Sequence, residues 1–173
     1  MLTLRLVPSS EITTEILERL WQDVLPYAAE EIQRMGSQEA LKQTLFDLRD
    51  FPVVKYEVDG FVVGIASTII KEFEGKNYLF YRFPFYGKDQ NGSRAWFYSE
   101  ENQREGYEML KRENLSGIMV VQNPFDKVTK ASTTHLGSFN KYFKPVRYLD
   151  EKTAGLLLTD QSLIICLYEL LEE

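Results

Sequence analysis

The chain has 173 residues, of which 44% are hydrophobic and 13% aromatic, a composition that favours one folded domain over residues 1–173. Its 20 basic and 26 acidic side chains give a formal net charge of −6, which argues against a general nucleic-acid or anionic-membrane binder. With a single cysteine, Cys166, and a single histidine, His135, the chain cannot form an internal disulfide, a Cys/His zinc site or an iron–sulfur cluster.

The first part of the chain predicts one strand followed by helices. Residues 2–7 alternate apolar and polar side chains, as a half-buried strand does. Apolar residues then recur at helical spacing, and Ser9 or Ser10 is the expected cap of this first helix. Gly36 is expected to end a second helical stretch, and Ser37 to cap a third helix.

The middle of the chain changes to the two-residue period of β-strands. Residues 53–58 and 61–70 flank Asp59-Gly60, a dipeptide typical of a two-residue hairpin. Aromatic side chains dominate residues 78–86, and a further strand is expected at 93–98.

Helices and strands alternate in the last part of the chain. The expected elements are a Ser-capped helix over 99–114, a strand over 117–122, a helix beginning at Asn123, and strands over 145–149 and 162–170. The connection is long enough for strands 93–98 and 117–122 to pair in parallel. We therefore expect an α+β fold, with a mostly antiparallel mixed sheet, one β-α-β unit and flanking helices.

This element order resembles that of the GNAT family, the Gcn5-related acyl-CoA N-acyltransferases. Three local patterns carry the resemblance. The strand over 117–122 runs into Asn123, and residues 139–146 look like the family's late helix end. Gln103-Arg104-Glu105-Gly106 fits the first half of the family's pyrophosphate-loop pattern, although Glu108 stands where that pattern has glycine or alanine.

The resemblance implies direct transfer of an acetyl group from acetyl-CoA to an amine, with both reactants held together in one complex. It implies Gln103, Arg104, Gly106 and Asn123 as residues that bind acetyl-CoA. It implies Tyr142, near the end of the late helix, as the catalytic acid for the leaving thiolate. Such a reaction needs neither a metal nor a covalent nucleophile, so we predict no metal site.

Other ionisable residues have less defined roles. A general base is not assigned, because Glu57, Glu100 and Glu101 are candidates that can equally be solvated surface charges. His135 lies on an apolar helical stripe and is expected to be a partly buried structural residue. Cys166 lies in a hydrophobic strand and is expected to be a small, unreactive core residue.

The alternative function is a GNAT-like scaffold without turnover that serves in phage assembly, in a virion or as a protein-interaction module. Trp96-Phe97, Ser99 and Thr134-His135 resemble features of degenerate GNAT-like proteins among tailed-phage genes. The aromatic segment 78–98 is then a surface for a protein partner or a second copy, although a covered sheet explains the same residues. A third hypothesis, an acidic protein that blocks a host nucleic-acid enzyme, rests only on net charge.

The partners expected from the sequence are an acyl-CoA and an amine, with no nucleic acid and no membrane. No apolar run has the length of a signal-peptide core or a membrane span, so we expect a cytoplasmic location, in the host cytoplasm if the chain is phage-encoded.

Overall fold

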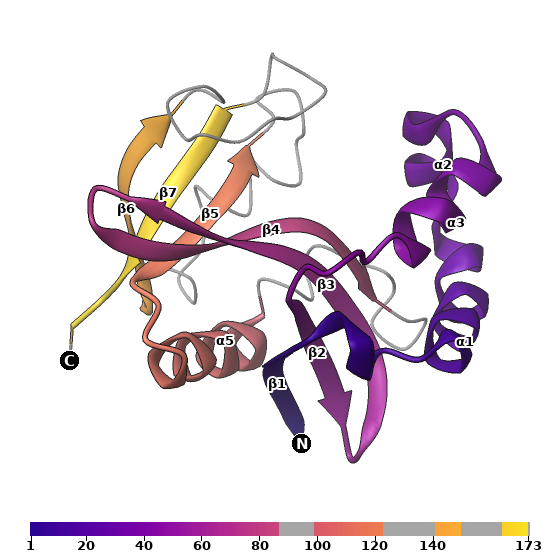
Figure 1. Ribbon diagram of the computed structural model, residues 1–173, viewed down its shortest axis with the longest axis horizontal. Coiled ribbons are helices and arrows are strands. Elements are labelled where there is room, and N and C mark those ends of the chain that lie inside the picture. The colour runs from indigo at the N-terminus through magenta and orange to yellow at the C-terminus, as the bar shows by residue number, and fades with distance from the viewer. Residues whose placement is uncertain (87–98, 123–140, 150–163, 173) are drawn as a thin grey trace. The chain divides into compact units, whose positions relative to one another are not determined.

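The computed structural model describes residues 1–86, 99–122, 141–149 and 164–172 (Figure 1). The chain forms two compact units. Unit 1 comprises Met1–Ile69 and Arg82–Trp96, and unit 2 comprises Ile70–Tyr81 and Phe97–Glu173. The described strands are hydrogen-bonded in the order β1-β2-β3-β4-β5-β7-β6, so the sheet is mixed and mostly antiparallel, as predicted.

Unit 1 is built on an antiparallel run of strands. These are β1 (Leu2–Val7), β2 (Val53–Val58), the first part of β3 (Phe61–Phe73) and the end of β4 (Lys76–Tyr86). The predicted hairpin between β2 and β3 is confirmed, because Asp59 and Gly60 have φ values of 50° and 85°. Strand β3 extends three residues beyond the predicted end, and from Ile69 to Phe73 its side chains alternate between half-buried and exposed.

Three α-helices of unit 1 follow the predicted stretches, with one correction. They are α1 (Thr14–Val24), α2 (Ala29–Met35) and α3 (Gln38–Phe46). Gly36 ends α2 with φ 92°, and the Ser37 hydroxyl caps α3, as predicted. The cap of α1 is Thr13, not Ser9 or Ser10, because residues 9–11 form a short 3₁₀ turn after Pro8.

The apolar faces of α1 and α3 cover the strands of unit 1. Leu20 and Trp21 of α1 and Leu45 of α3 belong to one cluster with Val53 of β2 and Ile65 of β3. The cluster also includes Phe85 near the end of β4. The i, i+3, i+4 spacing along α1 is therefore the spacing that buries these side chains.

Unit 2 contains the β-α-β part of the fold. After the first part of β4 come α5 (Glu100–Arg112), β5 (Gly117–Gln122), β6 (Phe143–Leu149) and β7 (Ile164–Leu170). Strand β5 lies between β4, to which it is parallel, and β7, to which it is antiparallel (Figure 1). Strand β6 closes this part through an antiparallel pairing with β7.

Two predictions for unit 2 need correction. The described parallel partner of 117–122 is β4 rather than 93–98, which lies outside the described residues. Phe143 opens β6 instead of ending a helix, because its backbone pairs with Leu170 of β7. In the described ranges, no helix has the length and apolar character needed to cross a membrane.

Candidate functional site

A short parallel ladder marks the β-α-β unit. Tyr78, Leu79 and Phe80 of β4 pair with residues 117–119 of β5. The parallel pairing stops after Phe80, although β5 continues to Gln122 in its pairing with β7. Helix α5 lies between β4 and β5 in the chain, and residues 113–116 join the end of the helix to the start of β5.

The amino end of α5 is a capped first turn. The Ser99 hydroxyl accepts a hydrogen bond from the Asn102 backbone N–H at 3.4 Å, and the Ser99 carbonyl accepts one from the Gln103 N–H at 3.0 Å. The Asn102 side chain is 2% exposed, and its Nδ2 has no hydrogen-bond partner in the part of the chain that the structure describes. A buried amide of this kind calls for an acceptor.

The predicted acetyl-CoA residues lie on different faces of α5. Gln103 and Gly106 are buried on the inward face, where Gln103 ends the first turn of the helix and Gly106 lies in the second. Arg104 points outward with half of its side chain exposed, and its Nε lies 3.7 Å from Glu105. Asn123 falls outside the described residues, as do Trp96, Phe97, Thr134 and His135.

Tyr142 occupies a turn directly before β6, so its expected place on a helix is wrong. Its carbonyl accepts a hydrogen bond from the Leu171 N–H at 2.8 Å, and its ring lies 5.5 Å from that of Tyr107 on α5. Its hydroxyl lies 3.5 Å from Oε1 of Glu100, in the first turn of α5. Two predicted candidates, Tyr142 and Glu100, are thus brought together from distant parts of the sequence.

Lys141 completes this group at the start of α5. Its Nζ lies 2.9 Å from Oε2 and 3.1 Å from Oε1 of Glu100. The hydrogen bond from Lys141 is the main cause that lowers the pKa of Glu100, and the same bond raises the pKa of Lys141. Glu100 therefore stays ionised and is a weak proton acceptor.

Glu57, a second candidate base, is held in an ion-pair group on β2. Arg5 Nη2 lies 2.7 Å and Lys55 Nζ 2.9 Å from its Oε1. The hydrogen bond from Arg5 is the largest cause that lowers the pKa of Glu57. This arrangement stabilises the carboxylate and again disfavours a role as general base.

Several side chains of the aromatic segment and Cys166 are core residues. Tyr78, Phe80, Phe85 and Tyr86 are each less than 10% exposed, as expected for a covered sheet. Cys166 is fully buried in β7, and burial raises the pKa of its thiol. Because a thiolate is the reactive form, this position agrees with the predicted unreactive residue.

An open cavity of about 450 Å³ lies at the other end of the parallel ladder. Its lining includes Lys76 at the start of β4 and Ser116 directly before β5. Glu169 on its wall accepts hydrogen bonds from Tyr78 and Lys76. Since this cavity is at the amino ends of the strands, it is separate from the point where the ladder stops.

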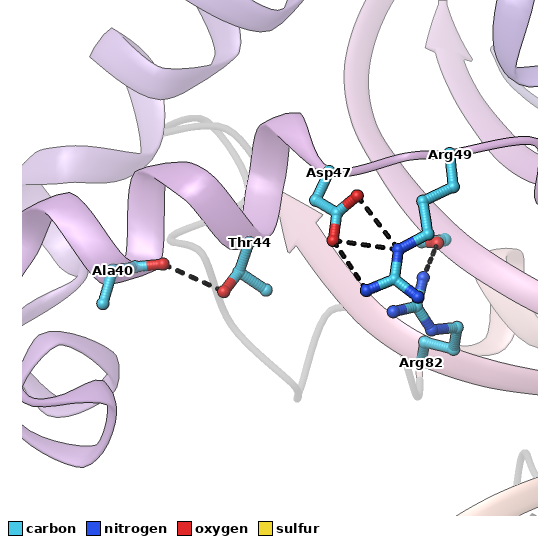
Figure 2. Close-up of polar contacts among 6 residues, drawn as sticks. Ala40, Thr44, Asp47, Arg49 and Arg82 are labelled. Carbon is cyan, nitrogen blue, oxygen red and sulfur yellow. Dashed lines mark hydrogen bonds and ion pairs between the residues drawn. The ribbon is translucent and has the colours of Figure 1, made fainter. Parts of the chain in front are cut away.

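A second polar group, which the sequence did not single out, lies in unit 1. Arg49 follows α3 and Arg82 comes from β4, and Figure 2 shows their guanidinium groups side by side, with Asp47 holding Arg49. Arg82 Nη1 donates to the Ser67 hydroxyl at 2.9 Å. An arginine within the aromatic run 78–86 was the available signal, because a charged side chain in such a strand needs partners.

Comparisons with known proteins agree on the fold. No protein-family model matches the sequence, and no curated protein matches it significantly. A solved spermidine N-acetyltransferase SpeG chimera from Vibrio cholerae and hSSAT is similar over 98% of this chain and 94% of its own, with 14% identity and a TM-score of 0.54.

Two further structures give the same result. An N-acetyltransferase from Staphylococcus aureus is similar over 98% of this chain and 97% of its own, with 8% identity and a TM-score of 0.50. Ard1 from Thermoplasma volcanium is similar over 99% of both chains, with 11% identity and a TM-score of 0.50. The chain therefore has the GNAT fold, as the sequence resemblance predicted.

Proposed function

From its GNAT fold, we propose that the chain is an acyltransferase that moves an acetyl group from acetyl-CoA to an amine by direct attack in a ternary complex. The observation that carries the proposal is the β-α-β unit. Strands β4 and β5 pair in parallel, and the Ser99-capped helix α5 lies between them in the chain. Because a fold does not by itself specify a function, the contacts at the start of α5 provide the second support for the proposal.

The start of α5 suits the phosphates of acetyl-CoA. Helix N-termini attract anions, and the buried Asn102 amide adds a donor that has no acceptor in the described part of the chain. The carboxylate of Glu100 opposes an anion there, but Lys141 pairs with it at 2.9 Å. Arg104 is the exposed cation of the predicted set, whereas Gln103 and Gly106 act by shaping the helix.

Tyr142 is the proposed acid for the leaving group. Acetyl-CoA supplies an acetyl group activated as a thioester. The acceptor nitrogen forms a bond to the acetyl carbon, the carbon–sulfur bond breaks, and the thiolate takes the Tyr142 proton. The proton that the amine loses restores the tyrosine, so the reaction is balanced without another reactant. Glu100 beside the hydroxyl holds Tyr142 in place.

Calorimetry with acetyl-CoA tests the proposal most directly. We expect saturable binding, and consumption of the thioester when a suitable amine is added. Absence of heat at millimolar acetyl-CoA, with protein shown to be folded by circular dichroism, would overturn it. The scaffold without turnover predicts an intact thioester, so the same assay separates the two functions.

Tyr142→Phe tests the role of the hydroxyl. Loss of a general acid lowers the rate by roughly a hundredfold or more, so kcat should fall by about that factor while the Kd for acetyl-CoA stays the same. Tyr148→Phe is the matched control, because Tyr148 is an exposed residue of the same strand region. Equal rates for the two variants would remove Tyr142 from the mechanism.

A further inference from the structure

The open cavity of about 450 Å³ at the amino ends of β4 and β5 has no part in the proposed acetyl transfer. All of its lining residues belong to unit 2, and they come from the start of β4, the second half of α5, Ser116 and residues 169–172. Binding sites for small molecules have volumes of roughly 300–1,000 Å³, so this cavity is large enough to hold one.

Hydrogen bonds to the backbone hold the walls of this cavity together. The Tyr107 hydroxyl of α5 donates to the Leu171 carbonyl at 2.7 Å. The Leu170 N–H donates to the Ser116 carbonyl at 3.1 Å, and the Ser116 N–H donates to the Asn77 carbonyl at 2.8 Å. These bonds join α5, the end of β7 and the starts of β4 and β5, so the cavity is a feature of the fold rather than a gap between loose side chains.

Glu169 supplies a carboxylate to the cavity. Its side chain is 21% exposed, and its Oε1 accepts hydrogen bonds from the Tyr78 hydroxyl at 3.0 Å and from Lys76 Nζ at 3.4 Å. Its other oxygen, Oε2, accepts none from the described part of the chain. Glu172, an exposed residue of the lining, adds a second carboxylate. A half-buried carboxylate oxygen of this kind can accept a hydrogen bond from the ammonium group of a ligand.

Lys76 supplies the opposite charge directly beside Glu169. Its ammonium group can donate three hydrogen bonds, and the contact with Glu169 uses one of them at a long distance of 3.4 Å. Lys111 adds a second cation to the lining, with its Nζ 4.5 Å from the centre of the Tyr107 ring. The cavity therefore combines adjacent charges of both signs with apolar surface, which comes from Tyr107, Leu170 and Leu171.

We propose that this cavity binds an α-amino acid with an apolar side chain. The carboxylate of the ligand contacts Lys76, its ammonium group contacts Glu169, and its side chain packs on the apolar lining. Lys76 Nζ and Glu169 Oε1 are 3.4 Å apart, and the two charges of an α-amino acid are adjacent in the same way. An ion of a single sign would be attracted by one of these residues and repelled by the other.

Titration of backbone amide signals by NMR tests the site with leucine as the probe. Leucine should shift the amides of Ser116, Leu170 and Leu171 saturably in the absence of acetyl-CoA. Shifts that do not saturate would overturn the site. Shifts centred on the first turn of α5 would also overturn it, because leucine would then bind at the proposed acetyl-transfer site.

Three analogues of leucine test the need for two adjacent charges. The isomer 6-aminohexanoate carries its charges far apart, 3-methylbutylamine lacks the carboxylate, and 4-methylpentanoate lacks the ammonium group. Each should bind about tenfold more weakly than leucine or worse, because each loses a charged hydrogen bond. An analogue that binds as tightly as leucine would contradict the proposal.

Two variants and a control locate the charges. Glu169→Gln and Lys76→Gln should each weaken leucine binding by about tenfold. The Lys76 side chain is 55% exposed, so its variant tests the proposal even if Glu169→Gln does not fold. Glu72→Gln changes an exposed residue of β3 outside the lining and should bind leucine as the wild type does. Unchanged leucine affinity in Lys76→Gln would refute the proposal.

This site and the proposed acetyl transfer can fail independently. Saturable leucine binding in the cavity, without any binding or cleavage of acetyl-CoA, supports the site and refutes acetyl transfer. Acetyl transfer to an amine, without leucine binding in the cavity, supports the proposed function and refutes the site.

Discussion

The Tyr78 hydroxyl lies 3.0 Å from Oε1 of Glu169, at the start of the parallel ladder. Burial and then this hydrogen bond raise the pKa of Tyr78 to about 12, from an ordinary value of 10.0. The unfolded chain therefore loses this proton at a lower pH than the folded chain does. The stability linked to Tyr78 is present below about pH 10 and is lost as the pH rises toward 12.

The corresponding variant is Tyr78→Phe. Urea unfolding at about pH 9 and about pH 11 should show a smaller loss of unfolding free energy in the variant than in the wild type. An equal loss of unfolding free energy in the variant and the wild type would mean that Tyr78 does not cause this pH dependence. Absorbance of phenolate gives an independent measure, because the variant should lack one late-titrating tyrosine.

Gly117 at the start of β5 is a second residue with a specific requirement. A Cβ at this position would lie 1.9 Å from the Tyr168 carbonyl oxygen and 2.9 Å from the Glu169 Cα. Both are backbone atoms of the neighbouring strand, so the β5–β7 ladder must separate, and Gly117→Ala should cost about 3 kcal/mol in denaturant unfolding.

Gly75→Ala is the control for Gly117→Ala. An added Cβ there meets no atom within 4 Å, and only the φ of 79° opposes the change. The cost should be about 1 kcal/mol. The sequence held no sign of the requirement at Gly117, because the strand that it meets is about fifty residues away in the chain.

At the scale of elements, caps should determine part of the helix stability. The Ser99 hydroxyl caps α5 at 3.4 Å, and the Ser37 hydroxyl caps α3 at 3.0 Å. Ser99→Ala and Ser37→Ala should each lower the unfolding free energy by about 1 kcal/mol, with the larger loss for Ser37→Ala because its bond is shorter. Chemical denaturation measures both, and a loss below about 0.3 kcal/mol would show that water replaces the cap.

The predicted elements show which parts of a fold the sequence specifies. Caps Ser37 and Ser99, the end of α2 at Gly36 and the hairpin at Asp59 were predicted correctly, because each depends on residues close in sequence. The parallel partner of β5 was predicted as 93–98, whereas the structure pairs β5 with β4. The sequence could not separate the two, because residues 78–86 and 93–98 share the same two-residue period.

The candidate site was only partly predictable for the same reason. Tyr142 and Glu100 were both singled out, but their contact joins segments about forty residues apart, and no local pattern encodes it. The Arg49–Arg82 group was missed altogether, because the aromatic run around Arg82 signals only that this arginine needs partners and does not indicate Arg49. What distinguishes them is the shared Phe51 ring, which only the tertiary structure provides.

At the scale of the whole molecule, the two compact units share continuous strands. Both β3 and β4 carry residues of unit 1 and of unit 2, so neither unit can lose its strands without disturbing the other. We therefore predict that the two units unfold together, in line with the single domain expected from the length. If the two units unfolded in separate transitions, one part of β3 and of β4 would have to unfold while the other part stayed folded.

Leu45→Ala tests this coupling. Leu45 is fully buried in α3, within the unit 1 cluster, and the variant should lose about 3 kcal/mol. If unfolding is cooperative, the slowest amides of β7 in unit 2 should exchange about a hundredfold faster, as should those of β2 in unit 1. Gln43→Ala, an exposed change on the same helix, should leave both rates unchanged. Faster exchange confined to β2 would show that unit 2 remains folded when unit 1 opens.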